Sequence, residues 1–260
     1  MAGLREYEYG DDVRHIDWNV TARLASPYVR EYDEDRELTA WFLLDLSPSV
    51  DFGSVADDRH KRTVLVDVVA TLARVLTRHG NRVGAVFYGR EVERVIPARA
   101  GRDQVLRLIR DLSEHPRHSS APMTDLTELL RSGRRWMRRR SLVFVISDFI
   151  SQPGWERELE LMSRRHEVLA IRLSDPREAT LPDVGPLLVE DAETGEQLVV
   201  DTSDRAFRGR FAAAGQAREV DIARAFGRAG VDAIPLSTDE DLVRAIVRMA
   251  ALRRRRRLQA

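Results

Sequence analysis

The feature that most constrains the fold of this chain is a short apolar run that ends abruptly in an aspartate, Trp41-Phe42-Leu43-Leu44-Asp45-Leu46-Ser47-Pro48-Ser49. Charged residues precede the run, so its length and its boundaries predict a strand that is buried on both faces. Asp45 would then emerge at the carboxyl end of the strand, where open α/β sheets have their binding crevices. The oxygens of Asp45, Ser47 and Ser49 suit a small divalent cation, although Asp and Ser are also ordinary turn and helix-capping residues.

Composition sets broad limits on the class of protein. The chain has 260 residues, of which 43% are hydrophobic, so it can bury a core and is not a disordered polymer. Its formal net charge is zero, which gives no global attraction to nucleic acid or to an anionic membrane. The chain has no cysteine, which excludes disulfides, thiolate zinc sites and a cysteine nucleophile. Lys61 is the only lysine, and we interpret this as a coding bias toward arginine at least as readily as a functional choice.

The sequence carries no membrane or secretion signal that we can identify. No window approaches the roughly eighteen consecutive apolar residues of a transmembrane helix. The N-terminal residues Met1 to Glu6 lack the basic and apolar regions of a signal peptide. We therefore expect a soluble cytoplasmic protein, in which any membrane association would come from a partner or from upstream sequence.

Predicted strands and helices alternate from residue 39 to residue 257. This alternation implies right-handed crossovers, a doubly wound, mostly parallel sheet and helices on both of its faces. We therefore predict an α/β domain over residues 39–260, preceded by a polar extension over residues 1–38 that packs on it. The strands are expected at 41–45, 82–88, 91–96, 142–148, 168–173 and 231–235, with a polar hairpin at 187–190 and 197–201.

Two of the most apolar strands end in an aspartate, Asp45 and Asp148. Thr124 lies in a loop directly before the helix that leads into the Asp148 strand, and Thr127, one helical turn later, is an alternative. In a doubly wound sheet these side chains can converge above the carboxyl edge of neighbouring strands. Mg²⁺ prefers octahedral oxygen geometry and keeps several waters, so an acidic group of a partner could take an open position.

These residues resemble the metal-ion-dependent adhesion site of von Willebrand factor A domains. Asp45-Leu46-Ser47-Pro48-Ser49 fits the first motif of that site, Thr124-Asp125-Leu126 the second and Ser147-Asp148 the third. The N-terminal run from Arg5 to Trp18, followed by Thr21-Ala22-Arg23, is similar to the signature of the DUF58 family, as are Phe52-Gly53 and Arg82-Val83-Gly84. The resemblance covers most of the chain.

The resemblance implies a von Willebrand factor A-like fold and a binding function without catalysis. It implies that Mg²⁺, or Mn²⁺, is held by a set of five side chains, namely Asp45, Ser47, Ser49, Thr124 and Asp148. Members of DUF58 are often encoded beside MoxR-type AAA+ ATPases, so the implied partner is such an ATPase or its client protein. No small-molecule substrate is expected.

The charged N-terminal extension has two interpretations. Its charges could form a lattice of ion pairs that attaches the extension to the main domain. They could instead form a contact surface for the ATPase, in which Trp18 would contribute packing more than ligand binding. The residues concerned are Asp11, Arg14, Asp17, Trp18 and Arg23.

Two other functions remain as alternatives. A Mg²⁺-dependent hydrolase could use the same strand-end carboxylates, although a phosphoaspartyl phosphatase would have a second carboxylate where this chain has Ser47. The chain has no nucleophile elbow and no phosphate-binding loop, so ATP binding is expected from the partner. The basic run Arg253–Arg257 could bind an anionic surface or nucleic acid, but such runs are commonly solvated helix ends. A zinc site at His115 and His118 is disfavoured, and we interpret both as solvated loop histidines.

Overall fold

In the computed structural model the described residues are 3–8, 16–24, 26–31, 38–54, 59–118, 121–190, 196–248 and 251. The chain divides into two compact units, Met1–Glu37 and Leu38–Ala260. None of the described helices is long and apolar enough to span a membrane.

In its described residues, the smaller unit has a two-stranded sheet and one short helix. Strand β1 (Gly3–Glu6) pairs antiparallel with β2 (Tyr28–Glu31), and α1 (Trp18–Leu24) lies between them in the chain. Asp17 begins the helix, since its carboxylate accepts hydrogen bonds from the N–H groups of Asn19 and Val20 at 3.0 and 3.3 Å. The sequence did not indicate this helix. The packing of the extension on the main domain stays a prediction.

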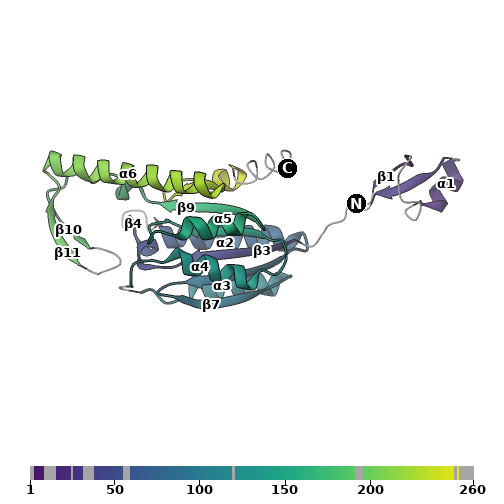
Figure 1. Ribbon diagram of the computed structural model, residues 1–260, viewed down its shortest axis with the longest axis horizontal. Coiled ribbons are helices and arrows are strands. Elements are labelled where there is room, and N and C mark those ends of the chain that lie inside the picture. The colour runs from purple at the N-terminus through teal and green to yellow at the C-terminus, as the bar shows by residue number, and fades with distance from the viewer. Residues whose placement is uncertain are drawn as a thin grey trace. The chain divides into compact units, whose positions relative to one another are not determined.

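The larger unit is built on a six-stranded sheet with the strand order β12-β9-β8-β3-β6-β7 (Figure 1). Only β7, at one edge, runs antiparallel to its neighbour. The alternating pattern of the sequence predicted this mostly parallel α/β sheet, and the prediction is confirmed. The strands are β3 (Thr39–Asp45), β6 (Arg82–Tyr88), β7 (Val92–Arg99), β8 (Leu142–Ser147), β9 (Glu167–Ser174) and β12 (Asp232–Ser237).

Helices cover both faces of the sheet. One face packs against α2 (Lys61–Arg78), α3 (Arg102–Ser113) and the helical residues 242–248. The other face packs against α4 (Leu126–Trp136), α5 (Trp155–Ser163) and α6 (Arg205–Ala229). Burial of one large apolar side chain stabilises the folded state by about 1.5–3 kcal/mol. The apolar run of β3 therefore stabilises the packing of both helical layers on the sheet. Successive side chains of that run alternate between the two cores.

Helix α4 lies unusually close to the central strand. A Cβ atom at Gly133 would lie 2.7 Å from Leu43 Cδ1, so only a glycine allows this approach. Helix α4 ends at Trp136, and Arg138–Arg140 follow it. The start of α4 is fixed by other contacts: the N–H groups of Leu126 and Thr127 donate to Ser151 Oγ and Asp125 Oδ1 at 3.0 and 2.9 Å, next to the loop that contains Thr124.

The predicted polar hairpin is present as β10 (Pro186–Glu190) and β11 (Gln197–Asp201), paired antiparallel. Its expected turn at 193–195 lies outside the described residues. Helix α6 extends past the sheet to this hairpin (Figure 1). The described part of this unit also contains four short elements: the 3₁₀ helices η2 (Pro48–Asp51) and η3 (Pro176–Glu178), and the paired strands β4 (Gly53–Ser54) and β5 (Arg59–His60).

Candidate metal centre

The two aspartate-terminated strands are neighbours in the sheet. In β3 and β8, Leu44 lies opposite Ile146, which brings Asp45 beside Ser147. The hydroxyl of Ser147 donates a hydrogen bond to Asp45 Oδ2 at 2.5 Å. Ser147 belongs to the third sequence motif, but it was not among the predicted ligands. It holds the Asp45 carboxylate in place across the strand ends.

The turn after β3 gathers the two predicted serines around Asp45. The Ser47 N–H donates to Asp45 Oδ1 at 3.0 Å, and the hydroxyls of Ser47 and Ser49 lie 3.2 Å apart. Pro48 begins the 3₁₀ helix η2, and Ser47 precedes it as the N-cap residue. The tight turn therefore directs two hydroxyls toward the same small region.

The backbone is strained directly after Asp148. The next residue, Phe149, has φ of 57°, which is rare for a residue with a large side chain. Its buried ring packs against Trp155 and Phe226, with ring centroids 5.2 and 4.7 Å apart. Aromatic packing thus offsets the strain of the turn. The Ile150 N–H donates to Asp148 Oδ1 at 3.0 Å and fixes the carboxylate.

Thr124 lies in a loop that is bonded to both strand ends. The N–H of the next residue, Asp125, donates to the hydroxyl of Tyr88, which pairs in register with Asp45. The Thr124 carbonyl accepts from the Gln152 N–H at 2.9 Å, in the segment that follows Asp148. Thr124 is buried, whereas the alternative, Thr127, is half-buried in the first turn of α4. The structure thus brings four of the five predicted ligands together by direct bonds or sequence adjacency and ties the Thr124 loop to them.

The structure places a positively charged side chain, that of Lys61, at these strand ends, which the sequence did not indicate. The ammonium of Lys61, at the start of α2, is fully buried and lies 2.8 Å from Asp148 Oδ2 and 2.5 Å from Glu178 Oε1. Its status as the only lysine was the one available signal. Glu178 is 117 positions away in the chain, and no sequence pattern connects it to the site.

Burial and charge separate the two aspartates. Burial raises the pKa of Asp45 to about 6, with a further contribution from the negative charge of Asp148. Burial alone would also raise the pKa of Asp148, but the neighbouring ammonium of Lys61 lowers it below its ordinary value. The pKa of Lys61 is raised, because Asp148 and Glu178 outweigh the lowering caused by burial. Asp45 is therefore the aspartate that Lys61 does not stabilise.

The donor set fits a small divalent cation in chemistry and in charge. Carboxylate and hydroxyl oxygens are the ligands that Mg²⁺ and Mn²⁺ prefer. Lys61 pairs with Asp148 and Glu178, and Asp45 lies at the neighbouring strand end, so these three carboxylates and one ammonium leave two negative charges when all are ionised. A divalent cation would neutralise this excess. It would also compete with Lys61 for Asp148 Oδ2.

The interpretation of His115 and His118 as solvated loop residues is wrong. Their side chains are 6% and 18% exposed, and both imidazoles face the carboxylate of Glu93 at the start of β7. Burial lowers the pKa of His115, although Glu93 opposes this. The sequence could not show this arrangement, because Glu93 and the histidines are brought together only by the fold.

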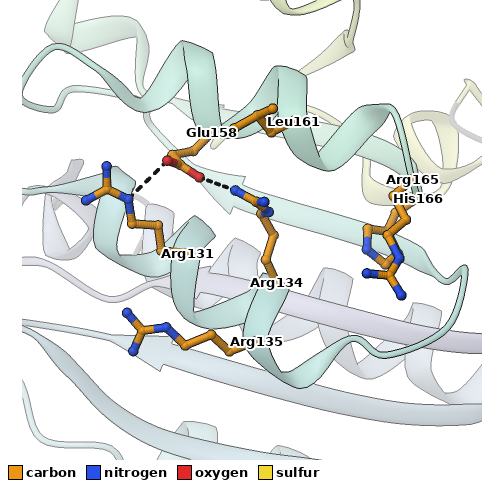
Figure 2. Close-up of a pocket in the computed structure, with 7 residues that line it drawn as sticks. All are labelled: Arg131, Arg134, Arg135, Glu158, Leu161, Arg165 and His166. Carbon is orange, nitrogen blue, oxygen red and sulfur yellow. Dashed lines mark hydrogen bonds and ion pairs between the residues drawn. The ribbon is translucent and has the colours of Figure 1, made fainter.

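A separate basic pocket lies between α4 and α5 and has a volume of about 400 Å³. Figure 2 shows the Glu158 carboxylate between Arg131 and Arg134, with ion pairs at 3.0 and 2.6 Å. His166 directly precedes β9, so the pocket opens toward the amino end of that strand, away from the ends of β3 and β8. The remaining lining residues are Arg135, Leu161 and Arg165.

The other predicted contact residues lie only partly within the described residues. Asp11 and Arg14 lie outside the described residues, as does the basic run 253–257. Asp17 is buried at the start of α1, while Trp18 and Arg23 are exposed on that helix. Their role as a contact surface stays a prediction.

Comparisons with known proteins give relatives over nearly the full chain. The family described as "Protein of unknown function DUF58" matches residues 3–221. The uncharacterized protein Rv1480 of Mycobacterium tuberculosis (strain H37Rv) is 40% identical over 252 residues, which cover 96% of this chain and 78% of that protein. The uncharacterized protein MAV169 of Mycobacterium avium is 39% identical over 160 residues, which cover 62% of this chain and 94% of that protein.

Solved structures show a von Willebrand factor A-like fold. The PilB minor pilin of Streptococcus sanguinis superposes with a TM-score of 0.50 at 9% identity, over 88% of this chain and 64% of the pilin. BatB of Bacteroides thetaiotaomicron gives a TM-score of 0.45 at 11% identity, over 74% of this chain and 98% of BatB. At these identities the likeness concerns the fold alone.

Proposed function

This chain belongs to the DUF58 family, and on that premise we propose that it is a metal-dependent adaptor that binds a protein partner without catalysing a reaction. In this proposal a divalent cation, Mg²⁺ or Mn²⁺, is held at the carboxyl edge of the sheet. The side chains that would hold it are Asp45, Ser47, Ser49, Thr124 and Asp148.

The observation that carries the proposal is the excess of buried negative charge at two neighbouring strand ends. Asp45 and Asp148 are both fully buried, and a buried carboxylate without a cation is costly. Lys61 pairs with only one of them, at Asp148. A divalent cation between the strand ends would balance the second, and the surrounding hydroxyls would complete its oxygen ligands.

Lys61 determines which contact the cation would replace. Its ammonium forms an ion pair with Asp148 Oδ2, and its second partner, Glu178 Oε1, lies 2.5 Å away. When a cation takes that oxygen, Lys61 keeps Glu178 as its counter-ion. The charges of the three carboxylates are then matched by the cation and the ammonium together.

The partner that we propose is a MoxR-type AAA+ ATPase or its client protein, in the cytoplasm. The open position of the cation would accept an acidic side chain of that partner, as the resemblance to adhesion sites implies. The five proposed ligands supply oxygen donors but leave coordination positions to solvent. A partner carboxylate is a suitable replacement for such a solvent ligand.

We expect this chain to bind the MoxR-type ATPase encoded in the same genome in the presence of Mg²⁺ and to lose that binding in EDTA. Biolayer interferometry with the purified full chain would measure it. Asp45→Ala should abolish the Mg²⁺-dependent signal, because it removes a carboxylate ligand. Asp221→Ala should leave it unchanged, because Asp221 is exposed on α6 and forms only a surface ion pair. Equal binding by the wild type and Asp45→Ala would contradict the proposal.

The same proteins separate this proposal from a hydrolase. A Mg²⁺-dependent hydrolase would turn over at least one substrate of a phosphoester panel, and Asp45→Ala would remove that turnover. The adaptor predicts no turnover that depends on Asp45. Loss of ATPase binding together with unchanged background hydrolysis would support the binding function.

A further inference from the structure

We propose that Glu93, His115 and His118 form a second metal site, which binds a transition-metal ion of the Zn²⁺ class. One carboxylate oxygen and two imidazole nitrogens lie within 4.8 Å of one another. Imidazole and carboxylate together suit Zn²⁺, whereas Mg²⁺ prefers oxygen ligands alone. The proposal is independent of the function proposed above for the ends of β3 and β8.

The distances already approach those of a coordinated ion. The Nε2 atoms of His115 and His118 lie 2.9 and 2.8 Å from the two carboxylate oxygens of Glu93. Ligand atoms at about 2.0–2.1 Å from a tetrahedral zinc are roughly 3.3 Å apart. Small side-chain movements would therefore place all three ligands around one ion and leave a fourth position for water.

The Nε2 atoms of both histidines are buried, and each faces an oxygen of the Glu93 carboxylate, at 2.9 Å for His115 and 2.8 Å for His118. The His115 side chain is more than nine-tenths buried, so its ring is held against Glu93 away from solvent. A metal ion between the nitrogens and the carboxylate would satisfy all three groups at once.

The local backbone leaves room for this cluster and holds its members. Gly89 lies directly against the cluster, since a Cβ atom there would lie 2.9 Å from His118 Nε2 and closer still to the Glu93 carboxylate. The Arg90 N–H donates to Glu93 Oε1 at 3.0 Å, and the Arg62 guanidinium donates to the His115 carbonyl at 2.6 Å. Such outer contacts orient ligands before the metal arrives.

The site would fix a functionally important segment of chain. His115 and His118 lie in the loop after α3, and the chain continues from them to Thr124. Glu93 lies in β7, close to the end of β6, where Tyr88 pairs with Asp45. A bound ion would thus hold in place the segment that leads to the Thr124 loop. The importance of this consequence rests on the proposed function, whereas the site itself does not.

We expect the untagged full chain, freed of metal by chelation, to bind one equivalent of Zn²⁺ in isothermal titration calorimetry. His118→Ala should weaken this binding by more than about 100-fold, since loss of an outer partner alone costs about 10–100-fold. Glu93→Gln, which keeps the side-chain volume, should also weaken it. His79→Ala is the matched control, because His79 is exposed at the end of α2, and it should bind as the wild type does.

Co²⁺ absorption provides a readout that does not depend on stability. Wild-type protein with Co²⁺ should show the visible bands of a low-coordinate nitrogen and oxygen site, and His118→Ala should lack them. Asp45→Ala should retain both the zinc equivalent and the bands, so that failure at the strand-end site is distinguished from failure here. Absence of a zinc equivalent in the wild type would overturn the proposal, as would wild-type affinity in His118→Ala or loss of the bands in Asp45→Ala.

Discussion

In metal-free buffer at pH 7 and above, Asp45→Asn should be more stable than the wild type. Burial and the charge of Asp148 raise the pKa of Asp45 from its ordinary value of 3.8 to about 6. One pKa unit corresponds to about 1.4 kcal/mol, so ionised Asp45 destabilises the folded state by roughly 3 kcal/mol. Asparagine removes the charge and keeps the shape, and we expect a gain of roughly 1–3 kcal/mol in the free energy of unfolding.

The pH dependence of this gain has a definite sign. A carboxyl group whose pKa is higher in the folded state than in the unfolded state contributes stability that is fully present below pH 3.8. That contribution is lost as the pH rises through about 6. Urea unfolding in EDTA should therefore show Asp45→Asn gaining on the wild type as the pH rises through this window. If the free energies of unfolding of the two proteins changed in parallel with pH, the charge of Asp45 would not destabilise the folded state, and the prediction would be wrong.

At the neighbouring strand end, Asp148→Asn should have the opposite effect. It removes the carboxylate that lies 2.8 Å from the fully buried ammonium of Lys61, and leaves Glu178 as the partner. Breaking a buried ion pair by removing one partner costs about 3–5 kcal/mol. Because Glu178 remains as a counter-ion, we expect a loss at the lower end of this range, about 3 kcal/mol in the free energy of unfolding, measured by urea denaturation in EDTA at neutral pH.

A double-mutant cycle tests the cause of this loss. Lys61→Met combined with Asp148→Asn should recover part of this stability, because the buried ammonium is then removed, while Glu178, whose side chain is 20% exposed, keeps access to solvent. The matched control is Asp221→Asn, which breaks the exposed pair with Arg224 and should cost less than about 1 kcal/mol. Additive effects of the two buried substitutions would contradict the assigned role of Lys61.

The sequence was sufficient to predict the fold, because hydrophobic periodicity reports directly on burial. The length and the flanks of the run from Trp41 to Leu44 predicted a strand buried on both faces. In the structure its side chains alternate between the two cores. Helix α1 of the smaller unit was missed, since it has only seven residues and its apolar residues stand at every second position, a period that is typical of a strand. The register that sets Asp45 beside Ser147 follows from the pairing of β3 with β8, which no local pattern specifies.

The candidate sites were predicted only in part, for the same reason. Asp45 and Asp148 were found because each interrupts an apolar strand at its end. Lys61 and Glu178 come from a helix and a 3₁₀ turn that are far apart in the chain, so only the fold reveals that both meet Asp148. His115 looked like a solvated loop residue until the packing of its loop placed it against Glu93.

The most direct test of the central claim is a titration of the metal-free wild type and Asp45→Ala with Mg²⁺, followed by thermal unfolding. A cation that binds only the folded protein stabilises it by mass action, and at about 100 times its Kd the Tm should rise by roughly 5–10 °C. We predict this rise in the wild type, with saturation, and a flat response in Asp45→Ala. A wild-type Tm that does not change with Mg²⁺ or Mn²⁺ would remove the cation from the ends of β3 and β8.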